Sequence, residues 1–222
     1  MNMLTARKTK GYKGVGMEGP IATWYAKNTA SALPEFRALA ERIAGELDRG
    51  DWVLEIAPGP GYLAVELARA GLQVSALDIS RAFVRITAEN AAKTGVAVDV
   101  QLGDAAAMPF ETDTFDFVVC RAAFKNFSNP VGALKEMRRV LRPAGRALII
   151  DMRREASDGE IAEEVAKMRL GRVDAFITRG ALRSLRRRAY TAPDFVRMIG
   201  EAGFSASAIA PSPIGFEIRL TK

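Results

Sequence analysis

The sequence predicts an α/β fold with seven strands in a mostly parallel sheet, an antiparallel last strand, helices on both faces and a helical cap. Two observations predict the sheet. Short apolar runs with a β-branched bias alternate with segments of helical periodicity from residue 34 to residue 151. Turns containing glycine or proline separate these segments. Strands that alternate with helices favour parallel pairing, with helices covering both faces of the sheet.

The amino-acid composition excludes several classes of enzyme and metal site. A chain of 222 residues with 49% hydrophobic and 26% charged residues is typical of one globular domain. It contains one cysteine and no histidine. An internal disulfide is therefore excluded, and no metal site or nucleophile–base pair can use imidazole. We expect no bound metal, and we disfavour zinc hydrolases and most nucleophilic hydrolases.

The first half of the chain shows the alternation clearly. In order, the predicted elements are a helix over residues 34–49, a strand over 52–57, a helix over 62–70, a strand over 73–78, a helix from Ser80 to about Gly95, and a strand over 98–101. Glycines at positions 50, 71 and 95 supply the stop signals. Ser80 is a residue type that caps a helix N-terminus with its hydroxyl.

The second half continues the pattern and then departs from it. The predicted elements are a strand over 115–120, a helix from Pro130, a strand over 146–151, a helical stretch over 158–189, a helix from Thr191 to Ala202, and strands over 205–210 and 215–221. Thr191 and Asp194 have the spacing of a reciprocal N-terminal cap. The last two strands are close enough in sequence to be antiparallel neighbours.

We expect one domain over residues 1–222, with two additions to the alternating core. Residues 155–189 are helical and rich in arginine, and we interpret them as an insertion that forms a cap over one end of the sheet. Residues 1–33 precede the pattern and carry Tyr12 and Tyr25 in an otherwise basic, glycine-rich start. This segment is predicted to be a lid over the ligand pocket. The alternative is an aromatic anchor that packs on the body of the fold.

No targeting or membrane segment is predicted. Residues 1–19 are polar and basic and lack the apolar central run of a signal peptide. No stretch reaches the roughly 18 apolar residues of a membrane helix. We therefore expect no membrane insertion and a cytoplasmic location. The sequence leaves the oligomeric state open.

The net charge of +6 is concentrated in two clusters. They consist of Arg7, Lys8, Lys10 and Lys13 near the start, and of Arg183, Arg186, Arg187 and Arg188. Without these eight residues, 24 basic residues face 26 acidic ones, so the body of the protein is slightly acidic. The clusters indicate either solvated surface or an anionic partner, such as an acidic substrate or a nucleic acid.

The strongest functional signal is the loop over residues 55–61, which leaves a buried strand and enters a helix. Gly59 and Gly61 allow a tight turn and a close approach of backbone to ligand. The helix N-terminus adds free N–H groups beside the loop. Asp78 ends the next strand, where a carboxylate can accept two hydrogen bonds from a ribose diol. The pattern predicts an adenosine-containing cofactor.

Two cofactor classes fit this loop. Residues 59–64 match the dinucleotide pattern G-x-G-x-x-[GA], which is weak evidence by itself. A dehydrogenase is disfavoured, because the chain has no histidine to act as its acid–base and no Tyr-x-x-x-Lys pair. The absence of a basic residue near the loop before Arg69 is a milder objection, because helix N–H groups can hold a pyrophosphate unaided.

Five stretches in order favour the other class. They are Val53 to Gly61, Leu77 to Ser80, Gly103 to Phe110 with the strand 115–120 after it, Leu141 to Arg146, and Tyr190 to Phe204. Over roughly residues 35–222 the sequence resembles the class I S-adenosylmethionine-dependent methyltransferases. It resembles most their small-molecule branch, which includes the ubiquinone/menaquinone C-methyltransferases. The resemblance implies a Rossmann-like sheet. The sequence departs from the family pattern at Ala57, where a glycine is usual.

The resemblance also implies roles for individual residues. Glu55 would orient the glycine loop and lie near the methionine amino group, with Ala57, Gly59 and Gly61 close to the cofactor. Asp78 would hold the ribose hydroxyls, with Ile79 against the adenine. Asp104 would accept from the adenine amino group, and the N–H of Ala105 would face a ring nitrogen. Arg121 follows the fourth strand, where the family places cofactor and substrate contacts. A structural ion pair is the alternative for Arg121.

The expected reaction is in-line transfer of the methyl group to a small-molecule acceptor, for which alignment and exclusion of water matter most. The sequence singles out no general base among Tyr12, Tyr25, Lys13, Lys125 and the acidic residues. Tyr12, Tyr25 and Phe124 are candidate acceptor contacts, although Phe124 is equally suited to the core. The second hypothesis is a nucleic-acid-binding protein or RNA methyltransferase that uses the basic clusters. The slightly acidic body and the lack of a familiar RNA-binding module disfavour it.

Overall fold

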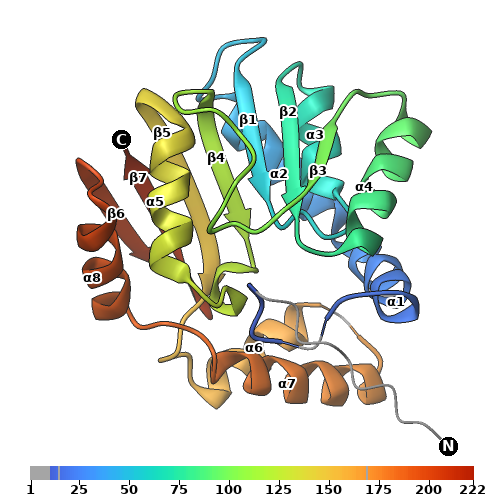
Figure 1. Ribbon diagram of the computed structural model, residues 1–222. Coiled ribbons are helices and arrows are strands. Elements are labelled where there is room, and N and C mark those ends of the chain that lie inside the picture. The colour runs from blue at the N-terminus through green and yellow to red at the C-terminus, as the bar shows by residue number, and fades with distance from the viewer. Residues whose placement is uncertain (1–10, 15, 169) are drawn as a thin grey trace, which may run out of the picture.

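The computed structural model describes residues 11–14, 16–168 and 170–222, and it contains a seven-stranded sheet in the order β3-β2-β1-β4-β5-β7-β6 (Figure 1). The strands are β1 (Trp52–Ile56), β2 (Gln73–Asp78), β3 (Asp99–Leu102), β4 (Phe115–Arg121), β5 (Leu141–Met152), β6 (Ala206–Pro211) and β7 (Gly215–Thr221). The first five strands are parallel, and β7 is antiparallel to both β5 and β6. The predicted fold class is confirmed.

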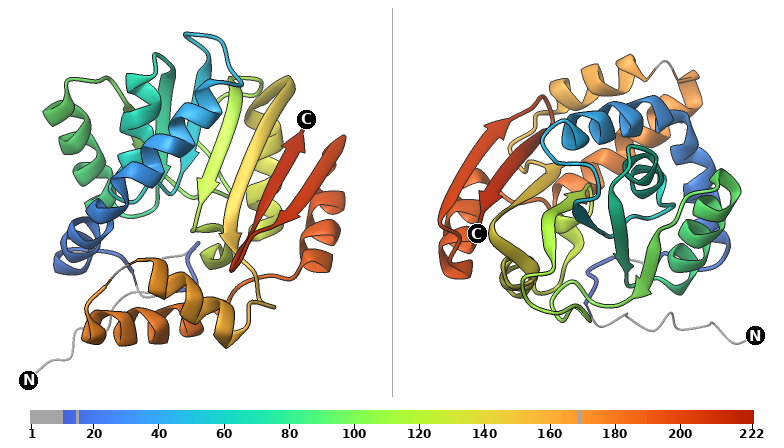
Figure 2. Two further views of the ribbon diagram at one scale, coloured as in Figure 1. Left: turned by 180° about the vertical axis from the view of Figure 1, so that it is seen from behind. Right: turned by 90° about the horizontal axis from the view of Figure 1, so that it is seen from above.

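Helices cover both faces of the sheet (Figures 1 and 2). On one face α2 (Leu33–Ala44) and α3 (Tyr62–Arg69) bury apolar side chains against β1 and β2. On the other face α5 (Pro130–Val140) and α8 (Ala192–Ala202) enclose the larger apolar cluster. The helix α4 (Arg81–Thr94) flanks β2 and β3. The sheet is therefore rigid on both sides, and its strand ends are available for a site.

The predicted helix starts agree with the observed caps. The Ser80 hydroxyl accepts from the amide of Phe83 at 3.1 Å, and α4 begins at the next residue, Arg81. Thr191 and Asp194 form the reciprocal cap of α8 in both directions. These local hydrogen bonds satisfy amides that a helix leaves unpaired at its start.

The helical stretch after β5 consists of two helices, α6 (Asp158–Lys167) and α7 (Arg172–Arg186). They lie below the carboxyl ends of the parallel strands in Figure 1. Ile161 and Val165 of α6 are buried and pack against Ala175 and Leu182 of α7. No side chain of α7 itself is fully buried. The insertion thus closes one end of the sheet with a helix that keeps one side toward solvent.

The N-terminal segment contains a helix that the sequence did not predict, α1 (Pro20–Thr29), followed by the short 3-10 helix η1 (Ala30–Ala32). Its buried side chains are Ala22 and Ala26, one helical turn apart. Small residues give little hydrophobic periodicity, which explains why the pattern was missed. Within the described residues, no helix combines the length and apolarity needed to cross a bilayer.

Candidate functional site

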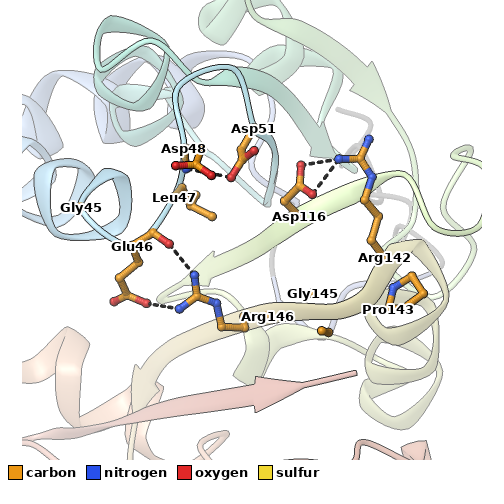
Figure 3. Close-up of a pocket in the computed structure, with 11 residues that line it drawn as sticks. Gly45, Glu46, Leu47, Asp48, Asp51, Asp116, Arg142, Pro143, Gly145 and Arg146 are labelled. Carbon is orange, nitrogen blue, oxygen red and sulfur yellow. Dashed lines mark hydrogen bonds and ion pairs between the residues drawn. The ribbon is translucent and has the colours of Figure 1, made fainter.

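One pocket lies at the amino ends of the strands and has a volume of about 460 Å³ (Figure 3). Both of its arginines already have acidic partners. Arg142 binds Asp116 at 2.6 Å, and Arg146 binds Glu46 at 3.0 Å. Because these ion pairs tie β4, β5 and the turn after α2 together, we assign this pocket a structural role.

A second pocket of about 500 Å³ lies at the opposite, carboxyl edge of the sheet. Its walls come mainly from the strand ends, the N-terminal segment, the turn after β4 and the helix α7, with Phe36 of α2 and Phe83 of α4. Among the lining residues are Glu55, Asp78, Asp104, Arg121, Tyr12, Trp24, Tyr25, Lys125, Asn126, Phe127, Ala181 and Leu185. Parallel strands expose ligand-binding groups at this edge. It is the candidate functional site.

Glu55 is buried on β1 with 3% of its surface exposed. Its Oε2 atom has no hydrogen-bond partner among the residues that the structure describes. Burial raises the pKa of this carboxyl to about 8. A buried acceptor without a donor is costly, so Glu55 is suited to a ligand that brings a donor or a positive charge.

Asp78 at the end of β2 is 5% exposed and joins two loops. One carboxylate oxygen accepts from the amide of Gly59 at 3.2 Å, and the other accepts from the amide of Ser80 at 2.9 Å. Burial raises its pKa to about 6, although both amides oppose this shift. Each oxygen keeps a lone pair for a further donor in the pocket.

The loop after β1 has an unusual backbone conformation. Ala57, Gly59 and Gly61 all have positive φ, at 56°, 56° and 76°. A Cβ atom at Gly61 would lie 2.4 Å from a methyl carbon of Thr87, so only glycine fits there. The Thr87 hydroxyl also donates to the carbonyl of Gly59 at 2.9 Å. The helix α4 therefore fixes the loop that the sequence indicated as a ligand cradle.

Ala57 is the departure from the family pattern, and it adopts the left-handed conformation that glycine usually supplies. Its amide donates to the carbonyl of Leu77 at 2.8 Å, which joins the loop to β2. The loop geometry is thus kept with a methyl group at this position, at some cost in backbone strain.

The loop after β3 forms another wall of the pocket. One Asp104 oxygen accepts from the amide of Ala106 at 2.9 Å. The other lies beside Gly11, where a Cβ atom would be 2.4 Å from Oδ2. Ile79 lies on the same side of Gly11, and Ala105 is buried and lines the pocket. The N-terminal segment therefore passes directly over the predicted adenine contacts.

Arg121 ends β4 and lines the pocket. Its guanidinium binds Glu35 at 3.0 Å and lies 4.5 Å from the ring centre of Phe36. It therefore makes the structural ion pair that the sequence left as an alternative, while it remains on the pocket wall.

The start of the chain is held to the turn after β4. The amide of Lys13 donates to the carbonyl of Asn126 at 2.8 Å, and the amide of Ser128 donates to the carbonyl of Gly11 at 3.0 Å. Tyr12 lies between these two hydrogen bonds, where its backbone forms an antiparallel β-bridge with Phe127. Tyr12 also lines the pocket. Burial raises the pKa of the Tyr12 phenol, so it stays neutral at physiological pH.

Residues 17 and 18 attach the same segment to α4. The Ser80 hydroxyl donates to the carbonyl of Met17 at 2.6 Å. The Glu18 carboxylate accepts from the amides of Arg81 and Ala82 at 2.9 and 3.1 Å. A carboxylate at a helix N-terminus is favourable because it meets unpaired amides and the positive end of the helix dipole.

Tyr25 on α1 completes this side of the pocket. Its ring meets Phe83 edge-on at 5.7 Å. A Cβ atom at Gly59 would lie 3.6 Å from its Cε1 atom, so the ring covers the glycine loop. Tyr25 is thus anchored to the body of the fold and also lines the pocket, and the lid stays a prediction.

The structure does not support the predicted acceptor contact of Phe124. This side chain is fully buried between Phe127, Tyr190 and Phe195, in the core alternative that the sequence left open. It does not line the pocket, whereas Phe127, three residues later, does. The 3-10 helix η2 (Phe124–Asn126) turns the two rings in different directions, which spacing alone does not reveal.

Sequence reasoning missed the role of Asp151 at the end of β5. Its carboxylate binds the Lys125 ammonium at 2.8 Å and the Lys125 amide at 2.8 Å, all in the interior. Lys125 also donates to the carbonyl of Ala122. Lys125 is therefore a buried ion-pair partner that also lines the pocket.

The arginine-rich cluster is partly neutralised. Arg183 and Arg186 both bind Asp158 of α6, at 3.3 and 3.0 Å. In the other cluster, the Lys13 ammonium donates to the Tyr190 hydroxyl at 2.7 Å. Arg7, Lys8 and Lys10 lie outside the described residues. Among the described residues, no group of three or more acidic or cysteine side chains has the arrangement of a metal site.

Residues 54–149, which contain the glycine loop, Asp78, Asp104 and Arg121, match the sequence model of the family described as methyltransferase domain. This segment is therefore similar to methyltransferase domains. The match confirms the resemblance to class I S-adenosylmethionine-dependent methyltransferases that the motifs predicted.

Curated relatives of this segment carry names of menaquinone and ubiquinone methyltransferases. The chain is 38% identical over 126 residues to the demethylmenaquinone methyltransferase of Mycobacterium bovis, covering 56% of this chain and 51% of that protein. It is 35% identical over 105 residues to the ubiquinone/menaquinone biosynthesis C-methyltransferase UbiE of Cupriavidus taiwanensis, covering 46% and 43%. The chain therefore aligns with about half the length of these relatives or less.

Solved structures share the fold of the methyltransferase domain together with its additions. A Methanococcus maripaludis protein assigned as an S-adenosyl-L-methionine-dependent methyltransferase matches with a TM-score of 0.71 and 22% identity, covering 91% of this chain and 92% of that one. The [4+2]-cyclase SpnF matches with a TM-score of 0.63 and 19% identity, covering 84% and 80%. Because a cyclase shares this fold, the likeness shows the fold alone.

Proposed function

We propose that the chain binds S-adenosylmethionine in the carboxyl-edge pocket and transfers its methyl group to a small, hydroxylated aromatic acceptor of the quinol type. The observation that carries the proposal is the pairing of two buried carboxylates, Glu55 and Asp78, on adjacent strands of one pocket beside a left-handed loop. The curated relatives support the acceptor class.

The residues fit this cofactor. The unpartnered Oε2 of Glu55 suits an ammonium group, because a cation pairs with the carboxylate and offers N–H donors. The Asp78 oxygens, each with one amide bond, suit a diol. Asp104, the amide of Ala105 and the half-buried Ile79 would take the adenine. When bound, the sulfonium supplies an activated methyl group.

The chain itself contributes position and exclusion of water. The amides of Ala57 and Gly59 donate to Leu77 and Asp78 of β2. The carbonyls of Gly59 and Pro60 accept from Thr87 and Asn90 of α4, so the cradle is formed before any ligand enters. Tyr12, Tyr25 and Phe127 offer apolar and hydroxyl surface on the acceptor side of the pocket. Residues 1–33 would act as the lid, and residues 155–189 as the cap, of one domain.

The test separates cofactor class from acceptor class. Isothermal titration with S-adenosylhomocysteine and with NADH should show binding of the first only. A turnover screen over phenols, hydroquinones, amines and thiols should then show methyl transfer to hydroquinones. Micromolar NADH binding would overturn the cofactor assignment, and transfer to amines or thiols alone would overturn the acceptor class.

A further inference from the structure

Helix α7 carries an exposed apolar stripe. Val173, Phe176 and Ile177 are 71%, 78% and 57% exposed, and no described residue covers them. A single exposed apolar side chain is ordinary, but three on adjacent positions of one helix face are not. The opposite side of α7 packs on α6 through Ala175 and Leu182, so the helix is well anchored while this stripe faces outward.

Arginines continue the same stripe. From Val173 the spacing of three and four residues leads through Phe176 and Gly180 to Arg183 and Arg187. Arg172 and Arg187 are exposed and form no ion pair among the described residues. The surface is therefore apolar at Val173, Phe176 and Ile177 and basic on both sides of them, at Arg172 and at Arg183 and Arg187. An amphipathic helix with basic residues beside its apolar face is typical of helices that lie in a membrane interface.

The stripe lies beside the pocket opening. Ala181 and Leu185 of α7 line the pocket from one side, and Trp24 of α1 lines it from another. Trp24 is 63% exposed and its helix neighbour Ile21 is 46% exposed. Both helices lie at the same end of the molecule (Figures 1 and 2). Apolar side chains thus flank the entrance on two elements that are far apart in sequence.

The geometry points to a membrane-docking surface: the exposed stripe of α7, with Trp24, binds the headgroup region of an anionic bilayer and places the pocket opening against the lipid. The arginines match anionic headgroups, and the apolar side chains match the region just below them. Docking of this kind is peripheral and needs no spanning helix. The surface does not depend on the proposed methyl transfer, since lipid binding is measurable without cofactor.

Two other occupants fit less well. In a symmetric pair of chains the stripe would meet itself, so arginines would face arginines or be buried against the apolar half, and both arrangements are costly. Nucleic acid would use the arginines for phosphate contacts, but it offers no partner for Val173 and Ile177. An anionic bilayer offers headgroups to the arginines and an apolar layer to Val173, Phe176 and Ile177.

The experiment is sedimentation with lipid vesicles of phosphatidylcholine alone and of phosphatidylcholine with phosphatidylglycerol in equal parts. We expect binding to the anionic vesicles only, weakened by salt. The double variant Val173→Ser/Phe176→Ser should weaken binding by about tenfold or more. Each of Arg172→Gln and Arg187→Gln should weaken it by about fivefold. Val196→Ser and Arg197→Gln on α8 are matched controls, since both positions are exposed, and should bind normally.

Tryptophan fluorescence gives an independent readout of orientation. A Trp52→Phe protein keeps only Trp24, whose emission should shift to the blue on anionic vesicles. A Trp24→Phe protein keeps only Trp52, which is 43% exposed at the start of β1 and should not shift. Each of these results would overturn the proposal: no vesicle binding, equal loss in the α8 controls, or a dimer in solution that Phe176→Ser converts to a monomer. RNA binding that falls with the arginine variants alone, without vesicle binding, would also overturn it.

Discussion

Asp78 at the end of β2 accepts a hydrogen bond from the amide of Gly59 at 3.2 Å, which joins the ends of two adjacent strands through one carboxylate. The same carboxylate holds the amide of Ser80, whose hydroxyl caps α4 and binds the carbonyl of Met17. One side chain thus organises the glycine loop, the start of α4 and the N-terminal segment. We expect ligand binding and local stability to depend on it together.

Asp78→Ala should weaken S-adenosylmethionine binding by about 1–3 kcal/mol, the range for hydrogen bonds to a charged group. Calorimetry measures the affinity, and thermal unfolding measures the lost support of the loop. Asp99→Ala, at an exposed position at the start of β3, is the control and should bind normally. Unchanged affinity in a folded Asp78→Ala protein would remove Asp78 from the site.

The buried carboxyl of Glu55 predicts a pH dependence of stability. Burial raises its pKa from the ordinary 4.5 to about 8, so the folded state holds a proton that the unfolded state releases. The contribution of Glu55 is therefore most favourable below about pH 4.5 and declines as the pH rises to about 8. Denaturant unfolding gives the free energy of unfolding of the wild type and of Glu55→Gln. The difference between the two free energies should change over this pH interval. A constant difference would contradict the raised pKa.

Glu55 also predicts proton release on ligand binding. If the cofactor ammonium pairs with this carboxylate, binding at pH 7 must ionise it, so affinity should increase as the pH approaches the pKa of about 8. Calorimetry in buffers of different ionisation enthalpy measures the number of protons released on binding. In Glu55→Gln the released proton should disappear and the affinity should fall. Release that persists in this variant would assign the proton to another group.

Ala57→Gly should stabilise the protein. A left-handed conformation costs a residue with a Cβ atom about 1–2 kcal/mol, and the greater freedom of glycine in the unfolded chain offsets about 0.5–1 kcal/mol. Ala144 has nearly the same φ, 62° against 56°, but is exposed near the amino ends of the strands. Ala144→Gly should therefore give a similar gain in denaturant unfolding, and only Ala57→Gly should alter cofactor affinity. A loss of stability in both variants would refute the strain argument.

The sequence predicted the sheet because its signals are local. Buried parallel strands are continuous apolar runs, and Ser80 and Thr191 cap their helices with hydrogen bonds to residues three positions away. The nearness of the two carboxylates followed from topology, since Glu55 lies one residue before the end of β1 and Asp78 ends the adjacent strand β2. Their orientation in the site depends on tertiary contacts such as the Gly59 bond, which no spacing encodes.

The remaining features depend on contacts between distant segments. Helix α1 was missed because its buried face is alanine, and Phe124 and Phe127 separate into core and pocket only because a 3-10 turn intervenes. Glu18 carries no sequence signal for capping α4, which begins 63 residues later. Asp151 pairs with Lys125 only because the fold brings the end of β5 beside the turn after β4, and the sequence places the two residues 26 positions apart.

The N-terminal segment is predicted to act as a lid over the pocket. Deleting residues 1–28 should leave a folded protein with little or no methyl transfer. The two large apolar clusters that hold the sheet together contain no residue from this segment, whereas Tyr12 and Tyr25 line the pocket. Loss of the contacts around Ala22 should lower the unfolding temperature without abolishing cooperative unfolding.

A point variant tests the lid without removing it. Glu18→Ala removes the carboxylate that holds the segment to the start of α4, at a cost of about 0.5–2 kcal/mol for a lost cap. It should loosen the lid and reduce turnover more than it reduces S-adenosylhomocysteine affinity, because exclusion of water matters to the transfer step. Glu89→Ala, at an exposed position of the same helix, is the control and should keep full turnover. Full activity of the truncated chain would reduce the segment to a tail, and its global unfolding would make the segment part of the core.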